Sequence, residues 1–266
     1  MTWSLDTALV AAGWGAVSGW LLPRLVARLP EPEPDPEADA DGAVDGIVPA
    51  ENEADYARPV DEPKELYADM AALPGLPWKL AVVTALASGL LGARLGWEPE
   101  LLFLLALVPV GVALAMIDWR TRYLPTRLIW PTYAVVLVLA VAASALDGDW
   151  STLLSALIGS AAAFAVFFAV WFVFPRGMAF GDVRLSALLG LALGWLSGVQ
   201  VVLGLYTGIL LGGVLGGLLA LAKVFHRRHY PFGPFLLAGA YLAVVFPREL
   251  LHAYAWVIEG IAGLFS

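Results

Sequence analysis

Two aspartates that border long apolar runs have the type and spacing to do chemistry. Asp118 lies in AMIDWRTRYLPTRLIWP and Asp182 in GMAFGDVRL, and both stretches border long apolar runs. A carboxylate inside a membrane costs about 2.5–3.5 kcal/mol, so by default it marks a functional site. Two carboxylates brought close together share one proton, and the ionised one can then act as general base on a water molecule. The pair predicts aspartic peptidase chemistry if the fold brings the two residues together.

Each aspartate also has a simpler explanation. Arg120 and Arg122 follow Asp118, and Arg184 follows Asp182, so each carboxylate could belong to an ion pair at the membrane interface. A transporter or channel could use paired membrane acids to carry protons or cations. That class predicts polar residues near the middle of several spans, whereas both aspartates border the ends of apolar runs.

The composition identifies an integral membrane protein. Of the 266 residues, 60% are hydrophobic and 14% are charged, whereas a soluble domain carries about a quarter charged residues. The apolar runs are too long and continuous for an outer-membrane barrel, which alternates over ~10-residue segments. The sequence contains no cysteine and three histidines. Disulfides, thiol catalysis and cysteine-ligated zinc are therefore excluded, and we expect neither a metal nor a cofactor.

The apolar runs predict an all-α polytopic fold with about eight transmembrane helices. Each span needs ~20 apolar residues to cross a hydrocarbon core of ~30 Å. The predicted spans are 4–28, 78–96, 100–118, 128–146, 152–174, 184–196, 198–223 and 233–263, with a kink at Pro247 in the last. Two spans separate Asp118 from Asp182, so both should lie at the same membrane face.

The charges of the loops predict the orientation. Alternate loops carry the basic residues Arg24, Arg28, Arg120, Arg122, Arg127, Arg176, Arg184, Lys223, Arg227 and Arg228. The loops between them carry the acidic residues Glu98, Glu100, Asp147 and Asp149, or no charge. Basic loops remain in the cytoplasm. The pattern predicts that both termini lie outside and that both aspartates face the cytoplasm.

Three regions follow from this pattern. We predict an uncleaved transmembrane anchor over 1–30, an acidic disordered cytoplasmic linker over 31–75, and a transmembrane domain over 76–266. Residues 31–65 hold 13 acidic residues against two basic ones and show no apolar periodicity, which is typical of disordered segments. The net charge of −8 therefore comes from the linker.

Three stretches resemble motifs of the type IV prepilin peptidases. Asp118, followed six and seven residues later by Leu-Pro, resembles their first aspartate motif. GMAFGDVRL resembles the second, Gly-Met-Gly-x-Gly-Asp-x-Lys-Leu, the signature of the GxGD class of intramembrane aspartic proteases. YPFGPFLLAGA resembles a third, a Pro-Phe-Gly-Pro run that opens the last span. The resemblance covers the chain from Leu76 onward.

The resemblance implies an aspartic endopeptidase of the bacterial cytoplasmic membrane. Its substrates would be prepilins and pseudopilins, cleaved at the cytoplasmic boundary while their apolar helix lies in the lipid bilayer. It implies Asp118 and Asp182 as the catalytic pair and no nucleic-acid partner. Supporting and groove-forming roles would fall to Gly181, Arg184, Pro231, Phe232, Gly233 and Pro234.

The chain also departs from the family pattern. Ala179 replaces the first glycine of GxGD and Arg184 the usual lysine, and a left-handed backbone at Ala179 would be strained. The acidic linker stands where bifunctional members carry a cysteine–zinc domain, so the chain resembles a short form. Nothing in it resembles a methyl-donor site, and we expect no S-adenosylmethionine and no methyl transfer. An inactive peptidase-like scaffold of pilus assembly remains an alternative.

Overall fold

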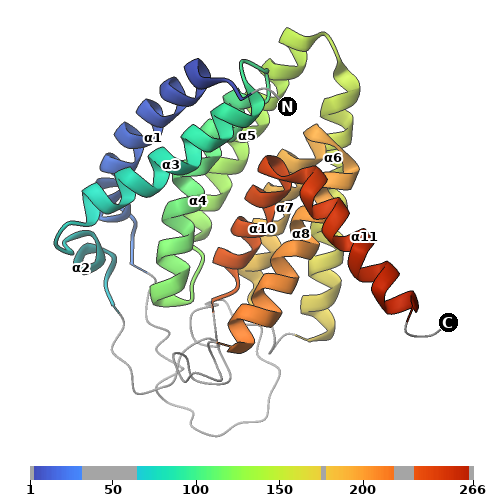
Figure 1. Ribbon diagram of the computed structural model, residues 1–266. Helices are drawn as coiled ribbons and strands as arrows, with labels where there is room; N and C mark the ends of the chain where they lie inside the picture. Colours follow the sequence, from blue (N-terminus) through green and yellow to red (C-terminus); the bar gives the residue numbers. More distant parts are fainter. Residues whose placement is uncertain (1–2, 32–64, 175–177, 219–230, 264–266) are drawn as a thin grey trace, which may run out of the picture.

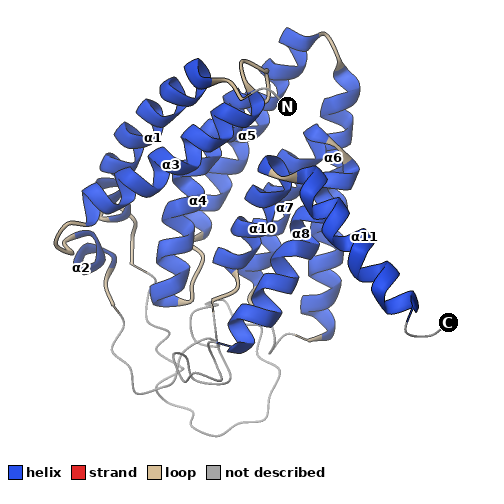
Figure 2. Ribbon diagram, viewed as in Figure 1, coloured by secondary structure: helices blue, strands red, loops and turns tan. Residues whose placement is uncertain are grey.

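A computed structural model describes residues 3–31, 65–174, 178–218 and 231–263, and these form helices and no strand (Figure 2). The helices are α1 (Leu5–Val26), α2 (Tyr67–Ala71), α3 (Leu76–Leu95), α4 (Leu101–Thr121), α5 (Thr126–Asp147), α6 (Trp150–Val173), α7 (Phe180–Leu196), α8 (Gly198–Leu211), the π-helix η1 (Gly212–Gly216), α10 (Gly233–Val245) and α11 (Pro247–Gly263).

The all-α polytopic fold is confirmed. Among the described residues, six helices are long and apolar enough to cross a membrane: α1, α3, α4, α5, α6 and α8 with η1. A seventh is reached if α10 and α11 count as one bent span. The predicted total of eight and the orientation of the termini stay predictions.

The last predicted span is two helices and not one kinked helix. Helices α10 and α11 meet at 105°, around Phe246. Pro247 has no N–H and begins α11, where that absence costs nothing. The Arg94 side chain of α3 donates a 2.9 Å hydrogen bond from Nε to the Val245 carbonyl, which satisfies the end of α10. Figure 1 shows α11 leaving the bundle at this bend.

Helix α7 is surrounded by other helices of the bundle. Thirteen of its 17 residues are buried, and it packs against α5, α6, α8 and α10. The helix is only ~26 Å long at 1.5 Å per residue. Its burial explains how a short helix that carries an acidic residue remains stable in this bundle.

Small residues bring neighbouring helices into close contact. A Cβ atom at Gly15 of α1 would lie 2.4 Å from the Thr84 carbonyl oxygen of α3, and one at Gly190 of α7 would lie 2.5 Å from the Gly159 carbonyl oxygen of α6. Side chains cannot occupy these positions without moving a backbone. Such seams are the usual way in which helices pack in lipid, where no hydrophobic force drives them together.

The predicted disordered linker is partly structured. Residues 32–64 lie outside the described residues, but residues 65–75 are ordered and contain α2. Tyr67 and Met70 are buried in the hydrophobic core, with exposed fractions of 1% and 0%. Burial of these two apolar side chains fixes the segment, so the ordered domain begins before residue 76.

Candidate active site

Asp118 lies in the last turn of α4. Its side chain is buried, with an exposed fraction of 5%. The helix ends at Arg122, which adopts a left-handed conformation (φ 55°) and donates a 2.8 Å hydrogen bond from its backbone N–H to the Asp118 carbonyl. Helical structure resumes at Thr126, directly after Pro125.

The Asp118 carboxylate contacts the motif that opens α10. Its Oδ2 accepts a 2.9 Å hydrogen bond from the backbone N–H of Gly233, a residue 115 positions away in the sequence. Close by, the Trp119 ring of α4 lies 6.5 Å from the Phe235 ring of α10. The first and third motifs found in the sequence therefore meet in the fold.

Asp182 lies in the first turn of α7 and is buried to the same extent, with an exposed fraction of 5%. Its backbone N–H donates a 3.1 Å hydrogen bond to the carbonyl of Ala179, the N-cap residue of α7. Ala179 is extended, with φ −75° and ψ 147°. No left-handed backbone is required there, so alanine in place of the first glycine causes no strain. Gly177 lies outside the described residues.

The start of α7 is attached to the start of α5. Arg184 Nη1 donates a hydrogen bond to Thr126 Oγ1 at the first residue of α5. The same guanidinium lies 4.7 Å from the centre of the Phe180 ring, and Phe180 packs edge-on against Trp171 of α6 at 4.9 Å. Arg184 thus joins the starts of α5 and α7, and its supporting role in the reaction stays a prediction.

Replacing Arg184 should loosen the attachment between α5 and α7. Arg184→Met removes both the donor and the cation over Phe180, and we expect it to lower the free energy of unfolding by ~1–3 kcal/mol. Arg184→Lys keeps a donor but loses the planar contact, so its loss should be smaller. Thermal unfolding in detergent measures both, and Thr126→Val should reproduce part of the methionine effect. Equal stability of the wild type and Arg184→Met would contradict this attachment.

Both aspartates and Gly233 lie at one end of the bundle. Helix α10 packs against α4 and α7, and Figure 1 shows the end of α4, the end of α6 that precedes Asp182, and the start of α10 at the same end. This end also contains the other residues predicted for the site. Three of them are buried, Gly181, Pro231 and Gly233, and two are half-buried, Phe232 and Pro234. The two buried carboxylates come from α4 and α7, which both pack against α10.

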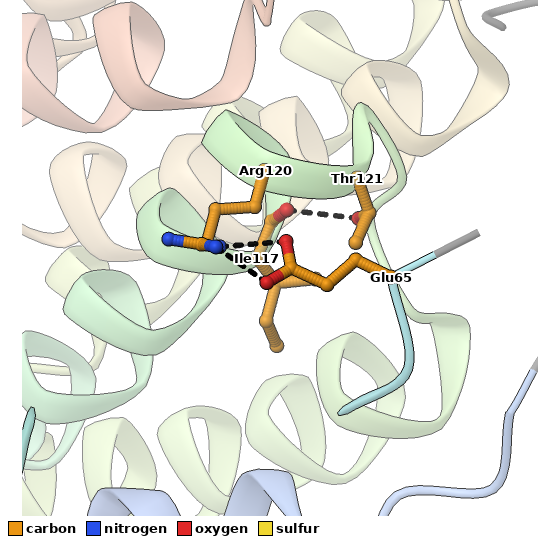
Figure 3. A network of polar contacts seen from close by, with 4 residues as sticks. All are labelled: Glu65, Ile117, Arg120 and Thr121. Atoms are coloured by element: carbon orange, nitrogen blue, oxygen red, sulfur yellow. Dashed lines mark hydrogen bonds and ion pairs between the residues drawn. The ribbon is translucent and has the colours of Figure 1, made fainter. Parts of the chain in front are cut away.

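A contact that the sequence analysis missed attaches the N-terminal part of the chain to this end (Figure 3). Arg120, two residues after Asp118, donates a 2.7 Å hydrogen bond from Nε to Glu65 Oε2, and its Nη2 contacts Glu65 Oε1. The next residue, Thr121, donates a 2.8 Å hydrogen bond to the Ile117 carbonyl. The feature of the sequence that could have revealed this contact is the pair Tyr67 and Met70, two apolar residues three positions apart beyond the acidic run. Their burial brings Glu65 to Arg120.

Reversing the charge of Glu65 should weaken this attachment modestly. The two side chains are 37% (Arg120) and 30% (Glu65) exposed, so solvent screens the pair, and we expect Glu65→Arg to cost no more than ~1 kcal/mol of unfolding free energy. Adding Arg120→Glu to that variant should restore part of the loss. Asp69→Arg, a similar change at an exposed position of α2, is the matched control. A double variant no more stable than the sum of its singles would show that the pair is uncoupled.

The described residues offer little for a metal ion. No group of three or more histidine, aspartate or glutamate side chains gathers among them. His226 and His229 lie outside the described residues.

Comparisons with known proteins agree with the motifs. Residues 102–221, which include both aspartates, match the type IV leader peptidase family. The chain is 31% identical over 176 residues to a prepilin leader peptidase/N-methyltransferase of Pseudomonas putida, covering 62% of this chain and 57% of that protein. It is 32% identical over 185 residues to the protein of the same name from Aeromonas salmonicida, covering 65% and 59%. The Bacillus subtilis protein of that name is 24% identical over 174 residues, covering 65% and 67%.

The chain spans a little under three fifths of the length of the first two relatives. No solved structure matches it.

Proposed function

We propose, from the type IV leader peptidase domain over residues 102–221, that the chain is an aspartic endopeptidase. It removes the leader peptide of type IV prepilins or pseudopilins at the cytoplasmic face of the bacterial cytoplasmic membrane. Asp118 and Asp182 are its catalytic pair. The observation that supports this most directly is the burial of both carboxylates, each 5% exposed, at one end of the helix bundle (Figure 1).

In this proposal the reaction needs only water and the two side chains. The ionised carboxylate takes a proton from a water molecule, whose oxygen attacks the carbonyl carbon of the scissile peptide bond. The protonated carboxyl group donates its proton to the carbonyl oxygen, which gives a tetrahedral intermediate. The first carboxyl group, which now holds the proton taken from water, gives it to the amide nitrogen. The C–N bond then breaks while the second carboxylate takes a proton back from a hydroxyl group of the intermediate. One proton shared by two carboxylates supplies both the base and the acid.

The membrane decides which bond reaches the site. A helical peptide bond is already hydrogen-bonded within its helix, so the target must be extended where it meets the carboxylates. A substrate whose apolar helix lies in the bilayer presents its leader at the cytoplasmic boundary, and the loop charges predict that the aspartates lie at this face. The names of the relatives also include an N-methyltransferase activity. We propose only the peptidase activity for this chain.

Cleavage of a prepilin by the purified chain in lipid vesicles tests the proposal. The substrate is a prepilin from the same genome, and mass spectrometry of the products shows the position of the cut. We expect one cut between a basic leader and the apolar helix. The Pseudomonas putida relative with its own prepilin controls for the vesicle conditions. An intact substrate in vesicles that support cleavage by that relative would count against the function proposed here.

A further inference from the structure

Gly233 approaches Asp118 more closely than any side chain would allow. Its backbone N–H donates to Asp118 Oδ2 at 2.9 Å, and both residues are buried. A Cβ atom at Gly233 would lie 2.8 Å from Oδ2, 3.3 Å from Cγ of the same carboxylate, and 3.3 Å from Leu124 Cδ1. A contact under 3.0 Å forces something to move, and here the nearest atom belongs to the carboxylate itself.

We propose that Gly233 is a positioning residue for Asp118, a proposal that rests on the function proposed above. Its N–H holds Oδ2 and its missing side chain leaves the carboxylate room. Oδ1 is then the oxygen presented to the reacting water. In this assignment the Pro-Phe-Gly-Pro run acts on the catalytic carboxylate through a backbone N–H, at the oxygen that does not face the reacting water. This role is in addition to any role in shaping a substrate groove.

The local sequence explains why the donor is Gly233. The first N–H groups of a helix have no partner within the helix, and they favour a negatively charged group. Gly233 is the first residue of α10, Pro234 has no N–H to offer, and the N–H of Phe235 already donates to the Phe232 carbonyl at 3.1 Å. Glycine before proline at this helix start therefore directs one unpaired donor at Asp118.

Gly233→Ala tests this role through the kinetics of prepilin cleavage. The added methyl group must displace the carboxylate, and misplacement of a reacting group by about 1 Å can cost ~100-fold in rate. We expect kcat to fall by ~100-fold and KM to change by less than about threefold, because the carboxylate acts in the chemical step. Gly213→Ala in η1 is the control, since a Cβ there meets nothing within 4 Å. Wild-type kcat in Gly233→Ala would overturn the inference.

A second variant separates the carboxylate from the neighbouring leucine. Valine at position 124 has no δ carbon, so Leu124→Val removes the atom 3.3 Å from the added Cβ. If the methyl group acts on Asp118, adding Leu124→Val to Gly233→Ala should leave kcat low. If the double variant instead has the kcat of Leu124→Val alone, the effect comes from packing against Leu124, and the positioning role is overturned.

A stability measurement tests the contact without activity. Gly233→Ala should lower the unfolding temperature in the wild-type background and lower it less in Asp118→Ala, where the clashing carboxylate is gone. The same decrease in both backgrounds would overturn the contact. If the wild type cleaves no prepilin, the proposed function fails, and this cycle still decides whether Gly233 holds Asp118. If the wild type and Gly233→Ala cleave equally well, the inference alone fails.

Discussion

Asp118→Asn and Asp182→Asn are each expected to lower kcat for prepilin cleavage by ~10²–10⁴-fold. Asparagine has nearly the shape of aspartate but neither accepts a proton from water nor donates one to a carbonyl oxygen as a carboxyl group does. General acid–base catalysis typically contributes a factor of this size. Single-turnover cleavage in vesicles, followed by mass spectrometry, measures the loss.

The pair should also behave as a unit. If one carboxylate needs the other, the double variant will be about as slow as the slower single variant, and the losses will not multiply. Asp147→Asn is the matched control, because Asp147 is an exposed aspartate at the end of α5 farther from the site. All variants should insert into membranes and unfold near the wild-type temperature. Normal cleavage by both single variants would rule out the dyad.

Much of the fold could be predicted from hydropathy and loop charge, because a membrane forces long apolar runs to become helices. The all-α polytopic class and the approximate helix ends followed from this. Two helices separate Asp118 from Asp182 in the sequence. An even number of crossings returns the chain to the same membrane face, so the two residues were expected at one end of the bundle. The bend at Phe246 was predicted only as a kink, since a proline marks where a helix is interrupted but not the angle that packing then selects.

The contacts that complete the site could not be predicted in the same way. The hydrogen bond between Gly233 and Asp118 joins residues 115 positions apart, and no local pattern gives the distance between them. Glu65 was assigned to a disordered linker because it closes an acidic run, although the burial of Tyr67 and Met70 fixes the residues just after it. Ala179 departs from the expected motif, yet its extended backbone accepts alanine. Each of these depends on tertiary packing.

Gly190→Leu is expected to lower both stability and activity, because it separates α6 from α7. A Cβ at Gly190 would lie 2.5 Å from the Gly159 carbonyl oxygen and 2.7 Å from Ala163 Cβ. Neither helix backbone can yield without moving its neighbours. Overpacking of a tight core typically costs ~1–3 kcal/mol, and the clash with the α6 backbone at Gly159 places this variant at the upper end. Thermal unfolding in detergent measures the loss.

Gly13→Leu is the matched control, because Gly13 lies on the exposed face of α1 and a Cβ there meets nothing within 4 Å. It makes the same change in helix propensity and should leave stability close to wild type. The loss at Gly190 should extend to cleavage, since Asp182 lies two helical turns away on the same buried helix. A Gly190→Leu protein as stable and active as Gly13→Leu would show that the α6–α7 seam does not hold Asp182 in place. If Gly190→Ala loses less of both than Gly190→Leu, helix separation is the cause, because the smaller side chain needs the smaller displacement.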